Sequence, residues 1–383
     1  MKIESIKLRN FKTFKETEIK DIPNFCVLVG ANGVGKSTLL KVFGFLKEAM
    51  MSNVSMALAK YGGSIGFKEV RSRGCEGNIE IQLQFRIKPG TPLVTYFLSI
   101  GENNGSPYVS REFLRYKRVP MGAPWHFLEF KNGKGWAVTN EFETTKRYED
   151  LKRVKETLKS KDILAIKGLA QFERFPAVRA LGDLIENWQV SDLHISKAQG
   201  ERAAGYAAHL SSSGDNLPLV TQYLHDKHRK EFGSILRKME KRVPGFTKIE
   251  AVTNEEGRVR LKFHDSGFKE PFLAHYVSDG TIKMFAYMVL LNDPNPHPLL
   301  CVEEPENQLY PLLLEELAEE FRDYANRGGQ VFVSTHSPDF LNAVELGEVF
   351  WLVREKGYTK IKRARDDEQI REYMEDGDKM GRL

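Results

Sequence analysis

The sequence predicts an α/β protein in which both ends of the chain build a helix-flanked sheet and the middle forms a large insertion. Short, continuous apolar runs near both ends are each followed by a helical pattern, as is typical of parallel strands covered on both faces. Between them, apolar and polar residues alternate over a long segment, which indicates antiparallel strands with one buried face. The length of 383 residues allows two or three folding units.

The N-terminal region is predicted to contain three strands and then a helix. The apolar run from Phe25 to Val29 is short and uninterrupted, which favours a buried strand. A glycine-rich turn follows, and the helical pattern extends from about Lys36 to Met51. The order of strand, turn and helix is therefore expected near residue 30.

The middle region begins with a clear strand and continues into helices. Apolar and polar residues alternate strictly from Ile79 to Lys88, and further strand-like pieces reach about Thr139, which predicts an antiparallel meander. Charged helical segments are then expected over three stretches: about Thr144–Lys159, Gln171–Trp188 and Leu217–Arg242.

The C-terminal region returns to alternating helices and strands. The expected elements are a helix over Thr281–Leu291, a strand over Leu299–Glu303, a helix from Pro311 to about Tyr324 and a strand over Gln330–Ser334. The predicted organisation is a head domain made of 1–60 and 272–363, a β-rich subdomain over 61–140, a helical subdomain with return strands over 141–271, and a C-terminal helix or tail over 364–383.

Composition narrows the class of protein. The net charge of +5 permits contact with nucleic acid without arguing for it. The longest apolar stretch, Met284 to Leu291, is far shorter than the roughly 20 residues of a membrane-spanning helix, so no membrane partner is expected. The first residues lack the apolar core of a signal peptide. Three cysteines without a paired framework favour a cytoplasmic protein.

A phosphate-binding loop follows the first apolar strand. The pattern G-x-x-x-x-G-K-S places glycines where the backbone must turn its N–H groups toward phosphate oxygens, and the next helix adds the positive end of its dipole. Its lysine would reach the terminal phosphates, and its serine hydroxyl would bind Mg²⁺. We expect ATP or GTP to bind here. The residues are Gly30, Ala31, Asn32, Gly33, Val34, Gly35, Lys36, Ser37 and Thr38.

Two later strands end in groups suited to phosphoryl transfer. Leu299–Glu303 ends in two adjacent carboxylates, and we assign Glu303 to Mg²⁺ and Glu304 as the general base that activates water. The following strand ends at His336, which could hydrogen-bond the γ-phosphate or the attacking water. The alternative for the carboxylates is a solvated acidic loop, and for the histidine a structural or surface role.

Ser278, Asp279 and Gly280 precede a helix, which alone indicates a helix cap and a tight turn. Together with the three motifs above, in this order, the chain resembles the ABC-type ATPases, specifically the RecF/SMC/OLD-like branch of soluble heads. The resemblance covers about 1–60 and 272–363, and it implies an ABC-type P-loop head with a mixed sheet flanked by helices. It also implies that the Ser278–Gly280 signature binds the γ-phosphate of ATP held by a second subunit.

The same resemblance implies further roles. Asn307 to Leu309 occupies the position of the D-loop, and His336 that of the switch histidine. Arg9 or Asn10, in the first-strand motif, would approach the nucleotide. The signature reads SDG rather than SGG, Glu303 stands where aspartate is more usual, and no glutamine stands out as a Q-loop residue. The long coiled-coil arms of SMC proteins are also missing.

These features predict an ATPase that uses ATP and Mg²⁺, dimerises around ATP with itself, and switches a DNA-directed or effector activity. The chain looks most like small bacterial and archaeal ATPases, several of which act in anti-phage defence beside a TOPRIM-type nuclease. We therefore expect a nuclease or toxin partner, with higher assembly and DNA contact left open. Basic residues between Lys227 and Arg242 motivate the DNA contact.

Four alternatives stay open with different weight. An ATP-gated scaffold with slow turnover, or a DNA-repair ATPase, uses the same motifs. A transporter energy subunit is disfavoured because 242 residues separate Lys36 from Ser278, far more than in transporter heads. Nuclease chemistry in this chain is disfavoured because Asp376 and Asp378 lie in a short polar tail and only 47 residues follow His336.

Overall fold

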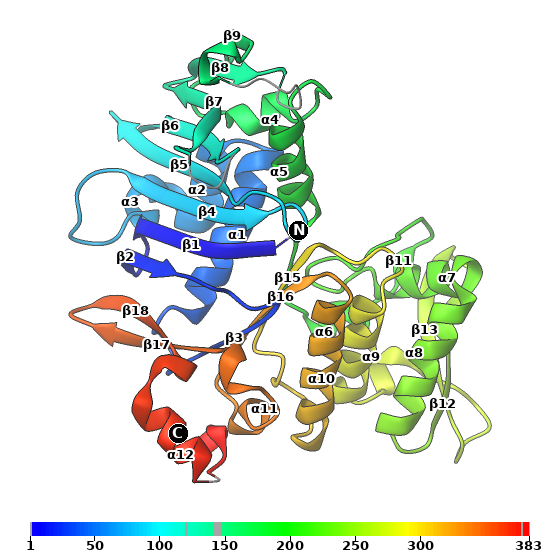
Figure 1. The fold of residues 1–383 in the computed structure, drawn as a ribbon. Helices are drawn as coiled ribbons and strands as arrows, with labels where there is room; N and C mark the ends of the chain where they lie inside the picture. The colour runs from blue at the N-terminus through cyan, green and yellow to red at the C-terminus, as the bar shows by residue number, and fades with distance from the viewer. Residues whose placement is uncertain (1, 119–121, 141–146, 377, 383) are drawn as a thin grey trace. The chain divides into compact units, whose positions relative to one another are not determined.

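The computed structural model describes residues 2–118, 122–140, 147–376 and 378–382. Contacts divide the chain into two compact units (Figure 1). The first unit comprises Met1–Trp188 and Leu346–Arg371, and the second comprises Gln189–Glu345 and Glu372–Leu383. The predicted insertion over 61–271 is therefore shared between the two units.

Among its described residues, the first unit contains two groups of strands. Five α-helices precede residue 189, and short 3₁₀ turns are not counted here. The strands are β1 (Lys2–Phe11), β2 (Phe14–Ile19), β3 (Phe25–Val29), β4 (Ile79–Arg86), β5 (Val94–Asn103), β6 (Ser106–Tyr116), β7 (Trp125–Lys131), β8 (Lys134–Val138), β9 (Arg153–Thr157), β17 (Val349–Glu355) and β18 (Tyr358–Arg363). The helices are α1 (Lys36–Met51), α2 (Val54–Gly62), α3 (Phe67–Val70), α4 (Ala165–Leu169) and α5 (Pro176–Asn187). A further helix, α12 (Glu368–Glu375), begins at the end of this unit.

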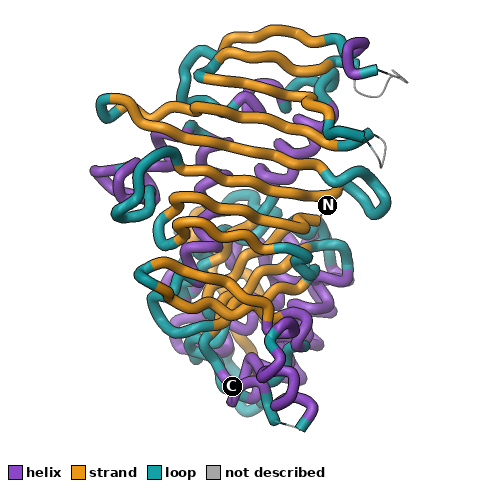
Figure 2. The backbone as a smooth tube through the Cα atoms, turned by 60° about the vertical axis from the view of Figure 1, so that its left-hand side comes forward, coloured by secondary structure: helices purple, strands orange, loops and turns teal. Residues whose placement is uncertain are grey.

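An eight-stranded antiparallel sheet dominates the first unit, in the order β2-β1-β4-β5-β6-β7-β8-β9. Figure 2 shows these strands side by side, with helices behind one face of the sheet. Side chains in β4 alternate between buried and half-buried, as the sequence predicted. Because β4 pairs with β1, the predicted β-rich meander is continuous with the first two strands.

A second group of strands in the first unit carries the phosphate-binding loop. β17 pairs in parallel with β3 and antiparallel with β18. The four residues Phe25–Leu28 of β3 are buried, which explains why this strand reads as a continuous apolar run. Parallel and antiparallel pairing in one group confirms the prediction of a mixed sheet.

The second unit contains the remaining elements. Its strands are β10 (Gln189–Ser191), β11 (Arg202–Ala203), β12 (Phe246–Thr253), β13 (Arg258–Asp265), β14 (Phe272–Leu273), β15 (Leu299–Glu303) and β16 (Gln330–Thr335). Its helices are α6 (Ile195–Ala198), α7 (Leu217–Lys227), α8 (Arg229–Arg242), α9 (Asp279–Leu291), α10 (Leu312–Asn326) and α11 (Pro338–Leu341).

Parallel strands position the acidic residues of the second unit. β15 pairs in parallel with β10 on one side and with β16 on the other. Glu303 lies opposite Ser334 in this register, so the carboxyl ends of β15 and β16 meet at one edge. Ligands bind at this edge in open α/β sheets. A smaller antiparallel group consists of β11, β13, β12 and β14.

Some predicted elements differ from the structure. Residues 144–146 of the predicted helix over Thr144–Lys159 lie outside the described residues. The rest contains a short 3₁₀ turn and β9 rather than an α-helix, so that prediction was wrong. β9 pairs with β8, with Trp136 opposite Lys155, and such long-range pairing overrides local helical preference. The predicted helix over Leu217–Arg242 is two helices, which meet at His228.

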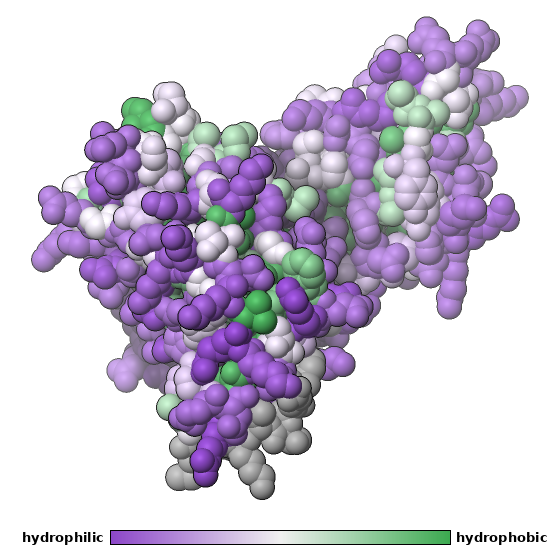
Figure 3. All heavy atoms as spheres, turned by 90° about the horizontal axis from the view of Figure 1, so that it is seen from above, coloured by the Kyte–Doolittle hydropathy of each residue, from purple (hydrophilic) through white to green (hydrophobic). Residues whose placement is uncertain are grey.

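Hydrophilic side chains cover most of the face shown in Figure 3, and hydrophobic ones form only small groups there. Within the described ranges, no helix combines the length and the apolar character needed to cross a membrane.

Candidate functional site

The phosphate-binding loop lies between β3 and α1, as the sequence predicted. α1 begins at Lys36, and no acidic residue stands in its first turn. Sixteen residues of helix therefore direct the positive end of their dipole and the first N–H groups toward the loop. This arrangement suits an anionic ligand such as a nucleotide phosphate.

The loop has a backbone that side chains would obstruct. Gly30, Gly33 and Gly35 have φ angles of 153°, 78° and 111°. A Cβ atom at Gly30 would lie 2.5 Å from the carbonyl oxygen of Leu352. A Cβ atom at Gly35 would lie 2.6 Å from Oγ1 of Thr359. Conformation therefore requires all three glycines, and the close approach of β17 and β18 adds a second requirement at Gly30 and Gly35.

Hydrogen bonds hold the loop in shape. Oγ1 of Thr359 donates to the carbonyl of Val34 at 2.6 Å, within the buried interior. Lys36 is buried, and its Nζ donates to the carbonyls of Gly30 and Ala31 at 2.6 and 3.2 Å. The lysine thus already spans the loop, and a phosphate would compete with these carbonyls for its ammonium group.

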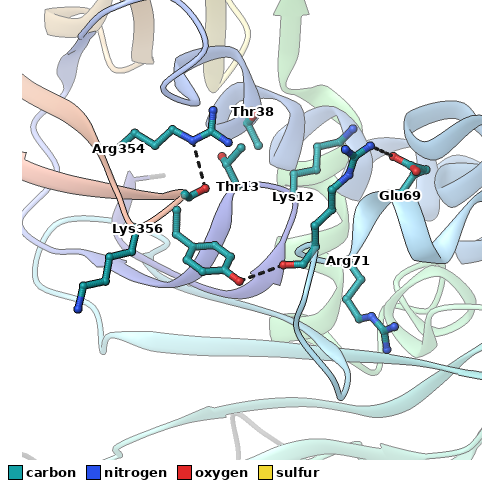
Figure 4. A pocket seen from close by; sticks show the side chains of 10 residues that line it. Lys12, Thr13, Thr38, Glu69, Arg71, Arg354 and Lys356 are labelled. Carbon is teal, nitrogen blue, oxygen red and sulfur yellow. Dashed lines mark hydrogen bonds and ion pairs between the residues drawn. The ribbon is translucent and has the colours of Figure 1, made fainter.

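A basic pocket of about 460 Å³ lies beside the first turn of α1 (Figure 4). Three segments of the first unit meet there: the β1–β2 turn, the end of α3 and the β17–β18 turn. Five of its lining residues are lysine or arginine, and one is acidic, so the pocket favours an anion. The lining residues are Lys12, Thr13, Thr38, Glu69, Arg71, Arg73, Arg354, Lys356, Gly357 and Tyr358.

The two first-strand candidates differ in surroundings. Arg9 is exposed and lies 3.7 Å from Glu80 in an ion pair. Asn10 is buried, with φ of 55°, and its Nδ2 donates to the carbonyls of Glu76 and Asn78 at 2.9 and 3.1 Å. Its amide hydrogens therefore fix the loop before β4. A nucleotide contact by either residue stays a prediction.

The carboxylates at the end of β15 lie where the strand leaves its regular geometry. Glu304 has a φ of 41°, unusual for a residue other than glycine. Its backbone N–H donates to the carbonyl of Ser334 at 2.8 Å, and its Oε2 accepts from Nδ2 of Asn307 at 3.1 Å. Glu303, the last residue of the strand, is half-buried.

His336 joins these acids from the end of β16. Its Nδ1 lies 3.5 Å from Oε1 of Glu304 and 3.3 Å from Oε1 of Glu306. Oε1 of Glu306 also accepts from Oγ1 of Thr335 at 2.8 Å and from the backbone N–H of His336 at 2.9 Å. The structure therefore brings together the predicted base and the predicted histidine, and Glu306 orients the segment that carries the histidine.

Lys283 connects the acidic cluster with the signature helix. It lies in α9, is buried, and donates from Nζ to the carbonyl of Asn307 at 2.5 Å. Burial lowers the pKa of its ammonium group to about 8, and the nearby charges of Glu306, Asp192 and Glu304 oppose that shift.

The predicted signature lies at the start of α9. Ser278 is the exposed N-cap, and its Oγ accepts from the backbone N–H of Thr281 at 3.3 Å. Asp279 accepts from Nε2 of Gln199 at 3.3 Å and from Nε2 of Gln308 at 3.4 Å. A Cβ atom at Gly280 would lie 3.0 Å from the carbonyl of Gln308. The signature and the predicted D-loop therefore touch within the second unit.

The donor groups suit the predicted Mg²⁺. Ser37 offers a hydroxyl in the first turn of α1, and Glu303 offers a carboxylate at the strand end, which are hard oxygen ligands of the kind Mg²⁺ prefers. Oε2 of Glu306 is buried and has no hydrogen-bond partner among the described residues, so the acidic cluster retains an acceptor for a cation or a bound water.

Several residues of these sites escaped the sequence analysis. The basic pocket draws on Arg71, Arg354 and Lys356, which no local motif singles out. Glu306 stands in the E-E-P-E run and could have been flagged by that run, but its role depends on Thr335 from the next strand. Lys283 lacked any signal beyond its place in the signature helix.

Comparisons with known proteins identify the family and the fold. A family model described as an AAA domain, putative AbiEii toxin of a type IV toxin–antitoxin system, matches residues 25–342. An ATP/GTP phosphatase of Helicobacter pylori (strain ATCC 700392 / 26695) is 21% identical over 387 residues, covering 96% of this chain and 93% of that protein. A crystal structure of an SMC head bound to the C-terminal winged-helix domain of ScpA aligns with a TM-score of 0.55 and 15% identity, covering 94% of this chain and 98% of the other.

The SMC-head alignment confirms the expected fold, that of an ABC-type P-loop head. The family model spans the phosphate-binding loop, the signature, both acids and the histidine. The chain therefore belongs to the AAA-domain family described as putative AbiEii toxins, and it is an ATPase-type protein with an SMC-like head.

Proposed function

We propose that this protein hydrolyses ATP with Mg²⁺ and works as a switch that closes into a dimer around the nucleotide. The observation that carries the proposal is the cluster at the ends of β15 and β16, where Glu304, Asn307 and His336 lie within contact distance. Paired with a phosphate-binding loop of the observed shape, this cluster supplies a base and a polarising group for attack on a γ-phosphate.

Each residue has one task in this scheme. Lys36 and the N–H groups of the loop hold the phosphates, and Ser37 and Glu303 hold Mg²⁺. Glu304 accepts a proton from the attacking water, and His336 orients the γ-phosphate or that water. Mg²⁺ neutralises charge on the phosphates when it is bound. The basic pocket beside α1 adds positive charge next to the loop, which favours the approach of an anionic nucleotide.

Exposed groups around the signature support dimerisation. Ser278 is exposed at the start of α9, where the first N–H groups of the helix would face an incoming anion. Large apolar side chains stand exposed next to the signature and the D-loop, at Tyr276, Tyr310 and Leu312, with exposed fractions of 72%, 65% and 73%. Exposed apolar residues of this kind mark protein interaction sites. A second copy, with its bound ATP, would cover them.

The dimer test compares two helix caps. Ser278→Ala should abolish ATP-dependent dimerisation of the Glu304→Gln background, measured by light scattering after gel filtration, while one-to-one ATP binding persists. Asn53→Ala removes an equivalent cap, since Asn53 accepts from the N–H of Met56 at 2.8 Å. Both caps contribute about 1 kcal/mol to stability. Equal loss of dimer in the two variants would contradict the proposed role of Ser278.

The turnover test uses Glu304. Glu304→Gln should lower kcat by about 100-fold or more, the typical contribution of a general base, and leave ATP affinity nearly unchanged. If the wild type hydrolyses ATP slowly and releases its partner at the same rate, the ATP-gated scaffold is favoured over a rapid ATPase. The expected partner, a nuclease or toxin subunit in anti-phage defence, is identified by what co-purifies with Glu304→Gln in ATP.

Nucleic acid is a second candidate target, because arginine and aromatic side chains share one face of the eight-stranded sheet. Phe97 stacks on Phe113 with ring centroids 4.9 Å apart, and the guanidinium groups of Arg111 and Arg115 lie 4.7 and 5.1 Å from the Phe113 ring. The Phe113 ring is itself buried and Nε of Arg111 lies 2.9 Å from Oε1 of Glu129, so the half-buried Phe97 and Arg115 are the groups that would meet a single strand by stacking and charge. Arg111→Ala with Arg115→Ala should weaken binding of a fluorescent oligonucleotide and reduce its salt dependence.

Two residues of the basic stretch that first suggested DNA contact, Lys238 and Arg242, are committed elsewhere. Nζ of Lys238 pairs with Oε2 of Glu320, and NH2 of Arg242 lies 3.0 Å from Oε1 of the same carboxylate. These charges neutralise a buried acid of α10 and are therefore poor donors to a phosphate backbone.

A further inference from the structure

A cluster of two histidines and one aspartate lies in the second unit, apart in sequence from the acidic residues at the end of β15. Asp293 and His297 belong to the turn between α9 and β15, and His209 belongs to the loop between β11 and α7. One ligand atom from each side chain lies within 4.8 Å of the others. Two imidazoles and one carboxylate are a donor set that divalent transition metals accept.

The carboxylate of this cluster is buried, and its hydrogen-bond partners are an imidazole and a backbone N–H. The side chain of Asp293 is 5% exposed, and Oδ2 lies 2.7 Å from Nδ1 of His209. Oδ1 accepts the backbone N–H of Asn295 at 2.8 Å. No lysine or arginine among the described residues pairs with Asp293. Burying a carboxylate is costly without a compensating cation, which a bound metal ion would supply.

The turn that carries two of the groups is fixed by hydrogen bonds. The hydroxyl of Tyr324 donates to the carbonyl of His297 at 2.9 Å, and the N–H of Gln330 donates to the carbonyl of Pro298 at 3.0 Å. NH2 of Arg327 donates to the carbonyl of Leu291 at the end of α9. The positions of Asp293 and His297 are therefore set by α10 and β16.

The loop that carries His209 is also held. Nδ2 of Asn216 donates to the carbonyl of His209 at 2.9 Å, and its Oδ1 accepts the N–H of Ser211 at 2.8 Å. Nε2 of Gln189 donates to the carbonyl of Leu210 at 3.2 Å. The imidazole rings of His209 and His297 then lie with centroids 5.1 Å apart. A preorganised backbone leaves only side-chain rotation for binding an ion.

We propose that His209, Asp293 and His297 bind one divalent transition-metal ion, with Zn²⁺ as the best-matched ion. Ligands about 2.0–2.1 Å from a tetrahedral zinc lie about 3.3 Å apart, so the side chains must move inward by rotation, and Asp293 exchanges its bond to His209 for the ion. His209 is 43% exposed, which leaves a solvent-facing fourth position. The ion neutralises Asp293 and ties the β11–α7 loop to the turn that leads into β15.

The experiment measures metal binding by the full-length chain after treatment with a chelator, without nucleotide. Titration with Co²⁺ should give the visible absorption of a tetrahedral site with N and O ligands, and Zn²⁺ should displace it at one ion per chain. Because loss of groups that merely orient ligands weakens metal sites by 10–100-fold, His209→Asn should weaken Zn²⁺ binding by about 100-fold or more. His297→Asn should do the same.

A matched control exists in the same unit. His225 and Asp226 form an exposed pair with Nδ1 and Oδ1 2.9 Å apart, but with no second histidine assigned to it. His225→Asn should leave the Co²⁺ spectrum and the Zn²⁺ affinity unchanged. Lys36→Ala should also leave them unchanged, which separates this site from the one for Mg²⁺ and ATP.

The proposal is overturned if His209→Asn binds Zn²⁺ as tightly as the wild type, or if His225→Asn weakens binding equally. Since His209 is largely exposed, its asparagine variant should fold, which circular dichroism checks, and this variant decides the question even where His297→Asn fails to fold. Absence of any Zn²⁺ or Co²⁺ binding below millimolar concentration also overturns it.

Discussion

Two glycines of the phosphate-binding loop allow the cost of backbone strain to be tested separately from the cost of steric contact. Gly33 and Gly35 have positive φ angles of 78° and 111°. Nothing lies within 4 Å of a Cβ atom built on Gly33, whereas one on Gly35 would meet Oγ1 of Thr359 at 2.6 Å and Oγ1 of Thr13 at 2.8 Å. Gly33→Ala therefore adds only backbone strain, and Gly35→Ala adds strain and two close contacts.

The expected magnitudes follow from these distances. An L-residue in the left-handed region costs roughly 1–2 kcal/mol, so Gly33→Ala should weaken ATP binding by about 5- to 30-fold. Gly35→Ala must in addition push Thr359 away from the carbonyl of Val34, and loss of a buried hydrogen bond costs about 1–3 kcal/mol more. Its ATP affinity should therefore fall at least about fivefold below that of Gly33→Ala.

The assay is the change in fluorescence of a labelled ATP analogue, with thermal unfolding measured in parallel. Thr359→Ala alone should weaken ATP binding, because it releases the carbonyl of Val34. In the Gly35→Ala background it should cost much less, because it removes the closest contact. Equal ATP affinities of Gly33→Ala and Gly35→Ala would refute the reasoning. So would an effect of Thr359→Ala on ATP affinity that is the same in the wild type and in Gly35→Ala.

Further predictions concern buried groups. Burial raises the pKa of Glu112 to about 7, although its carboxylate accepts from the N–H of Ala165. The stability that Glu112 contributes should therefore be fully present below about pH 4.3 and should fall by roughly 3–4 kcal/mol as the pH rises through 7, measured as the difference between the wild type and Glu112→Gln in chemical unfolding. Burial lowers the pKa of Lys283 to about 8, so the stability that Lys283 contributes should rise from pH 8 toward 10.5, measured as the difference between the wild type and Lys283→Met. Thr335→Val deletes a donor to Glu306 and should lower kcat about tenfold with unchanged ATP affinity in steady-state assays.

Local motifs predicted the parts of the fold that depend on neighbouring residues. β3 and α1 begin and end where the sequence indicated, because the apolar run, the glycine turn and the helical pattern are contiguous. The strand bounds at Leu299–Glu303 were also predicted, since burial on both faces demands an unbroken apolar run.

Features built from distant segments could not be predicted in this way. β9 looks helical by composition and becomes a strand only because β8 offers it an edge. The basic pocket brings Lys12, Arg71 and Arg354 together from three separate segments. Lys238 looked available to DNA because its partner, Glu320, comes from another helix.

The contacts within the second unit connect the signature to the catalytic base. Asp279 and Gly280 touch Gln308, Lys283 holds the carbonyl of Asn307, and Asn307 donates to Glu304. Both Glu304 and Gln308 have positive φ angles, of 41° and 64°, and such strain persists only where surrounding contacts impose it.

A displacement of the start of α9 would therefore alter the same contacts that impose the conformation of Glu304. If a partner's phosphate binds at Ser278, the ligand can shift this loop only by the difference in its affinity for the two arrangements. Truncation of Asn307 should then separate dimerisation from the acceleration of hydrolysis. Asn307→Ala would still dimerise with ATP, measured by light scattering, but dimerisation would no longer accelerate its ATP hydrolysis. Acceleration equal to that of the wild type would exclude this route of coupling.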